Sequence, residues 1–191
     1  MLMLVAGVIL VFVPHSVSIV APHWRDRMVL LVGEARWKSV YSVLVAAGFA
    51  LVILGFIAAY RAPIVLYLPP AWMRYVTFVL MLPVFPLLFA TYLPGRILAR
   101  AKHPMLAAVM LWSTAHLFAN GTLPGVLLCA CFLAWALIDR LSLGRRVPAP
   151  IRRAPPRRYN DALAVILGLA LYALFIWRLH GWIIGVPLLA R

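Results

Sequence analysis

Long apolar stretches alternate with short basic ones along this chain. Residues 1–24, 39–60 and 75–95 contain no Asp, Glu, Lys or Arg, and a fourth uncharged window of 36 residues runs from 103 to 138. Each of the first three windows matches the roughly 20 residues that cross a bilayer core as a helix. The fourth window is too long for a single span. The pattern therefore predicts several membrane-spanning helices.

Turn-forming residues divide the fourth window. Asn120-Gly121 is followed closely by Pro124-Gly125, and both dipeptides favour turns. We expect two helices joined by a tight turn, and a last helix whose N-cap is Asn160 or Asp161. The expected fold is an all-α, polytopic membrane bundle in one domain over residues 1–191, with six helices near 1–22, 39–60, 72–94, 104–119, 124–139 and 161–179.

Both ends of the chain are apolar. The first window has no positively charged start and no A-x-A site after it, so we interpret it as a retained span and not as a cleaved signal. The tail from residue 180 onward is apolar and rich in Gly and Pro. It is expected to lie at the membrane interface or to re-enter the membrane.

The composition agrees with a membrane protein. Hydrophobic residues make up 66% of the chain and charged residues 12%, against about 45–50% and about 25% in soluble domains. The formal charge of +14 does not indicate a nucleic-acid partner, because the basic residues fall between apolar windows and not along one face. The expected partner is the lipid bilayer.

The basic residues also orient the predicted helices. If the N-terminus lies outside, the inner loops are 22–38, 94–103 and 140–160, and they hold 14 of the 18 Lys and Arg residues. This distribution follows the positive-inside rule and predicts that both termini are non-cytoplasmic. The Pro/Arg-rich loop 140–160 is interpreted as a solvated linker that can rest on anionic head groups.

Acidic and sulfur-containing residues suggest no catalytic site. All four acidic residues, Asp26, Glu34, Asp139 and Asp161, map to the inner boundary. This argues against a carboxylate proton relay, a paired-carboxylate hydrolase or a two-metal site. Cys129 and Cys131 are two residues apart and do not face each other on a helix, so we interpret them as apolar filler.

Histidines are the polar residues that need an explanation. His23 and His180 are expected at helix ends with interfacial roles, and His103, before Pro104, is expected to cap its helix or to bind an anionic group. His15 and His116 lie deeper, about 15 Å and about 21 Å from the inner boundary.

Two neutral imidazoles at similar depth on separate helices suit a bis-histidine metal site, and haem fits best because its ring needs an apolar slot. The alternative is that each histidine only bonds a neighbouring helix. Trp112, Ser113 and Asn120 share a helix face with His116. Ser113 or Asn120 is expected to bind the second ring nitrogen and so to fix the tautomer.

The stretch 103–121, with the pattern HP-M-x-A-x-x-x-L-W-x-x-A-H-L-x-A-N-G, resembles the NnrU family of bacterial membrane proteins. VPHSV around His15, the Asp139-Arg140 pair and the closing H-G-W-x-x-G-V-x-L fit the same family. The family is similar to plant and cyanobacterial 15-cis-zeta-carotene isomerases, which bind haem b. The resemblance implies that His15 and His116 are axial haem ligands in a bacterial inner-membrane protein. Ser113 stands where the plant isomerases have a cysteine, and serine does not replace a soft iron ligand.

Several functions follow from this resemblance. The bacterial family is associated with nitric oxide reduction in denitrification, and its relatives with haem-dependent cis–trans isomerisation of a polyene. One alternative is a non-catalytic assembly or accessory factor of a nitric oxide reductase. Another is a membrane methyltransferase of the isoprenylcysteine kind, because KHP at 102–104 is similar to part of the motif of those enzymes. That motif also needs a later acidic residue, and none follows Asp161.

Overall fold

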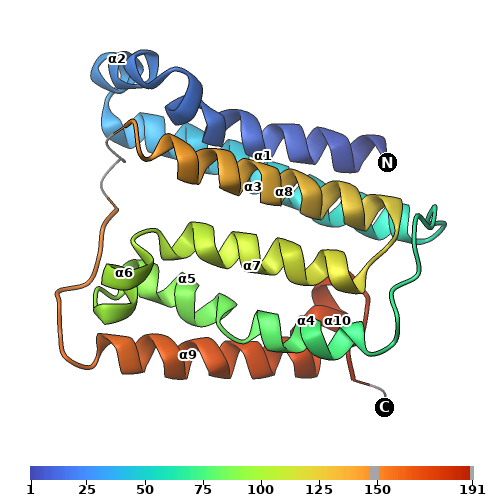
Figure 1. Cartoon of the computed structure of the whole chain (residues 1–191). Coiled ribbons are helices and arrows are strands. Elements are labelled where there is room, and N and C mark those ends of the chain that lie inside the picture. Colours follow the sequence, from blue (N-terminus) through green and yellow to red (C-terminus); the bar gives the residue numbers. More distant parts are fainter. Residues whose placement is uncertain (147–150, 190–191) are drawn as a thin grey trace. The chain divides into compact units, whose positions relative to one another are not determined.

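The computed structural model describes residues 1–146 and 151–189, and these residues form helices joined by short loops (Figure 1). The only β pairing in this described part is an isolated antiparallel bridge between Val65 and Thr122. The prediction of an all-α fold is therefore confirmed. The chain divides into two compact units, Met1–Ile64 and Val65–Arg191.

The first unit consists of three helices: α1 (Leu2–Val20), α2 (Pro22–Val32) and α3 (Glu34–Tyr60). Helices α1 and α3 pack backbone against backbone where glycines replace larger side chains. A Cβ atom on Gly55 would lie 2.4 Å from the Leu4 nitrogen, and one on Gly7 would lie 2.6 Å from the Val52 nitrogen. Small residues allow this close approach, which is typical of helix pairs in membranes.

Helix α2 was not predicted, because its sequence lies in a charged segment that was expected to be a loop. Pro22 occupies the first turn, where its missing N–H costs nothing, and Gly33 ends the helix at φ 85°. Trp24 of α2 lies edge-on to Trp37, with ring centroids 6.0 Å apart. Helix α3 then starts at Glu34, five residues before the predicted start at 39.

The second unit contains the remaining helices. They are α4 (Met73–Met81), α5 (Val84–Tyr92), α6 (Arg96–Ala101), α7 (Pro104–Ala119), α8 (Leu123–Ser142), α9 (Asn160–Leu174), a π-helical turn η1 (Phe175–Leu179) and α10 (His180–Ile184). The helix predicted near 72–94 is thus divided into α4 and α5, with Pro83 at the division. Residues 147–150 of the predicted loop 140–160 and residues 190–191 lie outside the described part.

Helix α5 lies between α7 and α9 (Figure 1). A Cβ atom on Gly168 of α9 would lie 2.3 Å from the Pro86 nitrogen of α5, so these two helices touch along their backbones. Thr77 donates a hydrogen bond from Oγ1 to the Ala115 carbonyl of α7 (2.9 Å), and Tyr172 donates one to the Phe78 carbonyl (2.7 Å). These bonds join α4 to α7 and to α9.

Asp161 does not cap its own helix, so that prediction is wrong. The N-cap of α9 is Tyr159. The Asp161 carboxylate instead accepts hydrogen bonds from the Arg96 and Ile97 backbone nitrogens, at 2.8 and 3.1 Å, at the first turn of α6. The neighbouring Asn160 donates to the Pro94 carbonyl (2.8 Å). The pair therefore fastens the start of α9 to the loop after α5.

Five helical segments of the described chain are long and apolar enough to cross a bilayer: Leu2–Val20, Glu34–Tyr60, Met73–Tyr92, Leu123–Ser142 and Asn160–Ile184. Helix α7 is shorter but also apolar. Many large apolar side chains are exposed, among them Leu2 (86%) and Leu30 (86%). Such exposure suits contact with lipid chains and not with water.

Candidate functional site

His116 lies in the last turn of α7, at the end of the helix that joins α8 (Figure 1). Its Nδ1 is 2.8 Å from the Trp112 carbonyl oxygen, four residues earlier. A carbonyl only accepts hydrogen bonds, so Nδ1 carries the proton and Nε2 has the lone pair. This is the tautomer that binds a metal through Nε2, with the second nitrogen held by an outer partner.

The prediction that Ser113 or Asn120 fixes this tautomer is wrong, because the Trp112 carbonyl does so. The Asn120 side chain has another role, since its Oδ1 accepts hydrogen bonds from Thr122 N (3.1 Å) and Thr122 Oγ1 (2.7 Å). Asn120 therefore shapes the turn that leads into α8. The spacing of four residues predicted that Asn120 shares a helix face with His116. Its Oδ1 is instead bound by Thr122 in the turn.

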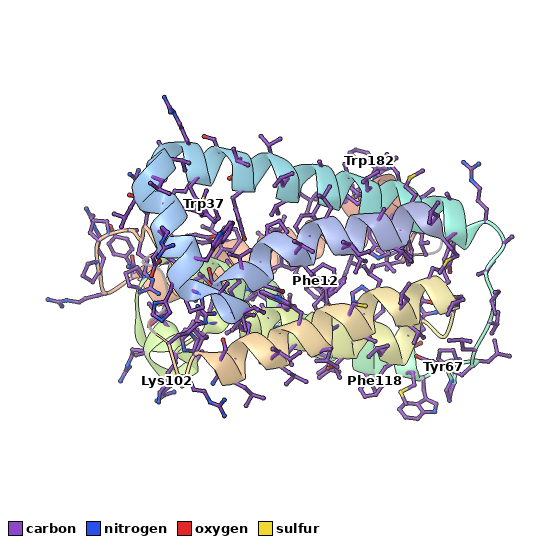
Figure 2. All side chains as sticks on the ribbon, turned by 90° about the horizontal axis from the view of Figure 1, so that it is seen from above. Phe12, Trp37, Tyr67, Lys102, Phe118 and Trp182 are labelled. Atoms are coloured by element: carbon purple, nitrogen blue, oxygen red, sulfur yellow. The ribbon has the colours of Figure 1, made fainter. Side chains whose placement is uncertain are left out.

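The loop before α4 is fastened to the same turn. Tyr67 donates its hydroxyl hydrogen towards the carbonyls of Leu117 and Asn120, and the Leu66 backbone nitrogen donates to the Gly121 carbonyl (2.8 Å). Figure 2 shows Tyr67 near Phe118, at the end of the second unit opposite Lys102. This end, where His116 lies, is thus held by a backbone and side-chain network.

An aromatic ring packs beside His116. The Trp112 ring is 4.9 Å from the His116 ring, and Phe132 of α8 lies edge-on to Trp112 at 5.4 Å. Ser113, one turn before His116, is completely buried, and its hydroxyl has no hydrogen-bond partner in the described part of the chain. An unmet buried hydroxyl costs about 1–3 kcal/mol, so it is an unusual feature for this position.

His15 belongs to the first unit and lies in the C-terminal half of α1, directly after Pro14. Its Nδ1 is 2.7 Å from the Val11 carbonyl oxygen, so it has the same tautomer as His116. The Tyr41 ring of α3 is 5.2 Å from the His15 ring. His15 and His116 belong to different units, and their joint binding of one metal stays a prediction.

His180 lies beside His116, which its place in the sequence did not predict. It was expected as an interfacial residue at a helix end, but its ring centroid lies 6.5 Å from that of His116, with 21° between the ring planes. Its Nδ1 is 2.7 Å from the Val186 carbonyl oxygen. The only hint in the sequence is the pattern H-G-W-x-x-G that begins at His180. Its second glycine, Gly185, adopts φ 82° and allows the chain to turn after α10.

His103 occupies the N-cap position of α7, and its side chain makes no capping hydrogen bond. Burial and, next, the nearby Arg140 guanidinium lower the pKa of His103 below its usual value of 6.5. Arg140 also donates to the Ala101 carbonyl (3.3 Å). The neutral form of His103 is therefore favoured at this end of the second unit.

The number of metal-binding side chains that lie together limits which kind of metal site the chain can form. Within residues 1–146 and 151–189, no three His, Cys, Asp or Glu side chains are placed to hold a metal ion. A structural or catalytic zinc site needs at least three protein ligands. Haem needs only one or two, because the porphyrin supplies the other nitrogens. Imidazoles with Nε2 lone pairs in aromatic surroundings fit this second case.

One family model, described as NnrU protein, matches residues 3–188 of the chain. No curated protein and no solved structure gives a match.

Proposed function

The chain belongs to the NnrU family, and on this premise we propose that it is a haem b protein of the bacterial inner membrane. In this proposal, His116 is one axial ligand and His15 the other. Haem held by these residues would supply an iron that could take a small ligand such as nitric oxide, or interact with a polyene double bond, once one of the two imidazoles has dissociated. The proposed role is in nitric oxide reduction or in cis–trans isomerisation of a polyene.

The observation that carries the proposal is the tautomer of His116. Its Nδ1 hydrogen is donated to the Trp112 carbonyl, which orients the ring and leaves Nε2 as the basic nitrogen. Haem proteins use a neutral imidazole in this state, and the outer hydrogen bond makes the ligand more basic. His15 has the same arrangement with the Val11 carbonyl.

The surroundings of His116 agree with a large apolar cofactor. Trp112 presents aromatic surface beside the imidazole, and Phe132 packs against Trp112; such surface suits a porphyrin ring. The buried Ser113 hydroxyl is a donor that can point at a group bound next to His116. The four acidic residues belong to α2, α3, α8 and α9 and none belongs to α7, and neither proposed reaction needs a carboxylate base.

The proposed location follows from the helices and the charges. Five long apolar segments and the shorter α7 allow six crossings, which would put the segments 22–38, 94–103 and 140–160, with 14 of the 18 basic residues, on one side. We propose that this side is cytoplasmic and that both termini are outside. Fusing a reporter that is active only in the periplasm to each terminus, and to the α8–α9 loop as a control, tests the orientation.

Spectroscopy of the full chain tests haem binding. The chain is expressed in haem-replete cells, purified in detergent, and compared with His116→Asn, whose amide retains a donor near Nδ1 but has no Nε2. We expect a Soret band in the wild type and its loss, or at least a tenfold lower haem content, in the variant. The matched control is His23→Asn on the exposed part of α2, which should keep the band. A colourless wild type would reject the proposal and favour a non-catalytic accessory factor.

Two further measurements separate the proposed reactions. Nitric oxide added to the reduced protein should shift the Soret band if the iron offers an open position. Expression in a host that accumulates a tri-cis carotenoid should change its pigments if the protein isomerises polyenes. Unchanged pigments would remove the isomerase function while leaving haem binding intact.

A further inference from the structure

The second unit contains two histidines that lie together although they are far apart in the sequence. His116 lies in the last turn of α7 and His180 begins α10, and their ring centroids are 6.5 Å apart with 21° between the planes. Both residues belong to the compact unit Val65–Arg191.

Both imidazoles make the same kind of hydrogen bond through Nδ1. His116 Nδ1 donates to the Trp112 carbonyl at 2.8 Å, and His180 Nδ1 donates to the Val186 carbonyl at 2.7 Å. Since both carbonyls are acceptors only, each ring has its lone pair on Nε2. The pair therefore offers two neutral nitrogen donors whose orientations are fixed from behind, as in metal-binding histidines.

The separation of the rings matches the distance that a shared metal requires. With metal–nitrogen bonds of about 2.0 Å and roughly 1.1 Å from Nε2 to the ring centre, two imidazoles on opposite faces of one metal have centroids about 6 Å apart. The observed 6.5 Å is close to this value.

The backbone is irregular on both sides of His180. The π-helical turn η1 directly precedes it, and Gly185, in the left-handed conformation at φ 82°, reverses the chain five residues later. A π-helical turn inserts one residue into a helix and rotates the residues that follow, and such turns are frequent at functional sites. Here the rotation determines which side of the helix His180 faces.

This inference rests on the proposed haem function and deepens it. We propose that His180 is a third ligand of the His116 centre, and that it takes the axial position opposite His116 when His15 does not. The exchange breaks one iron–nitrogen bond and forms another, with no change in oxidation state and no proton transferred, because both imidazoles bind as neutral Nε2 donors. The second unit then holds haem with ligands of its own.

The experiment compares single and double variants of the full-length protein in detergent. His180→Asn retains a donor for the Val186 carbonyl and removes Nε2. If His180 had only a structural role, the spin state of the iron would therefore not change in this variant. His15→Asn does the same for the Val11 carbonyl. For each variant, haem content, absorption and electron paramagnetic resonance report whether the ferric iron is six-coordinate and low-spin or five-coordinate and high-spin.

We expect His15→Asn to stay low-spin with nearly full haem content, because His180 replaces the lost ligand. The double variant should be high-spin, with haem content lowered at least threefold, and added imidazole should return it to the low-spin state. A high-spin His180→Asn single variant would overturn the proposal in this form, because His180 would then be the resting ligand in place of His15. His23→Asn serves as the matched control, and gel filtration checks that each variant is folded.

Two further results would overturn the inference, and they are distinguishable. If His15→Asn alone becomes high-spin and the double variant is no different from it, His180 does not bind the iron, while the proposed haem function stands. If the wild type contains no haem, even after titration with haemin, the proposed function and this inference both fail.

Discussion

Replacing Asp161 by alanine tests the least expected contact of the fold. The Asp161 carboxylate accepts hydrogen bonds from the backbone nitrogens of Arg96 (2.8 Å) and Ile97 (3.1 Å) at the start of α6. Residue 95 must be glycine for this approach, because a Cβ there would lie 2.3 Å from Asp161 Oδ1. The side chain thus fixes α9 to a segment more than sixty residues earlier in the chain.

The expected loss follows from these two bonds. Hydrogen bonds to a charged group contribute about 1.5–3 kcal/mol each, and a carboxylate at a helix N-terminus adds about 0.3–1 kcal/mol. Because Asp161 is half-buried and water replaces part of the loss, we expect Asp161→Ala to lower the free energy of unfolding by about 2–3 kcal/mol. Asp161→Asn, which keeps one acceptor oxygen, should lose roughly half as much.

Unfolding in mixed micelles with increasing sodium dodecyl sulfate, followed by circular dichroism, measures this difference. Asp26→Ala is the matched control, since the Asp26 side chain is 61% exposed and pairs with the adjacent Arg25. A surface pair of this kind contributes less than about 1 kcal/mol. If Asp161→Ala costs no more than Asp26→Ala, the carboxylate does not hold α6, and our account of this contact is refuted.

Three further changes should have measurable effects. Gly55→Ala should lower the midpoint of unfolding strongly, because the new Cβ would lie 2.4 Å from the α1 backbone. Gly144→Ala, whose Cβ would have its nearest atom at 3.5 Å, should change the midpoint little. Equal midpoints for the two variants would contradict the close packing of α1 and α3. Tyr67→Phe removes the hydroxyl that binds the α7–α8 turn and should cost about 1 kcal/mol, with faster hydrogen exchange at that turn as the check. The lowered pKa of His103 means that the unfolded state binds more protons than the folded state below pH 6.5, so stability should fall as the pH drops through this range. His103→Gln should remove this part of the pH dependence, and an unchanged profile would show that His103 does not cause it.

Much of the fold could be predicted from the lengths of the uncharged windows. The all-α class, the division of the window 103–138 into α7 and α8, and the apolar spans all follow from helix length and turn-forming dipeptides. Element ends were less predictable. Glu34 and Ser142 extend α3 and α8 beyond the uncharged windows, because charged residues continue a helix beyond the apolar part that a window detects.

The candidate site could be predicted only in part. The apolar surroundings of His116 singled it out in the sequence, and the structure adds the Trp112 carbonyl as its partner. Spacing on one helix cannot reveal a backbone carbonyl as the acceptor, because every helical residue offers one. His180 was not associated with His116, since a π-helical turn changes the helical register without a recognisable sequence signal.

The glycine contacts between α1 and α3 have a consequence for biogenesis. Since Gly7 and Gly55 allow these two helices to meet backbone to backbone, the segment Met1–Ile64 contains both halves of its own interface. A ribosome that has delivered this segment to the insertion machinery has already supplied everything the hairpin needs to close. We therefore expect the hairpin to form in the membrane during translation, before α7 leaves the exit tunnel, so that assembly proceeds from the N-terminus.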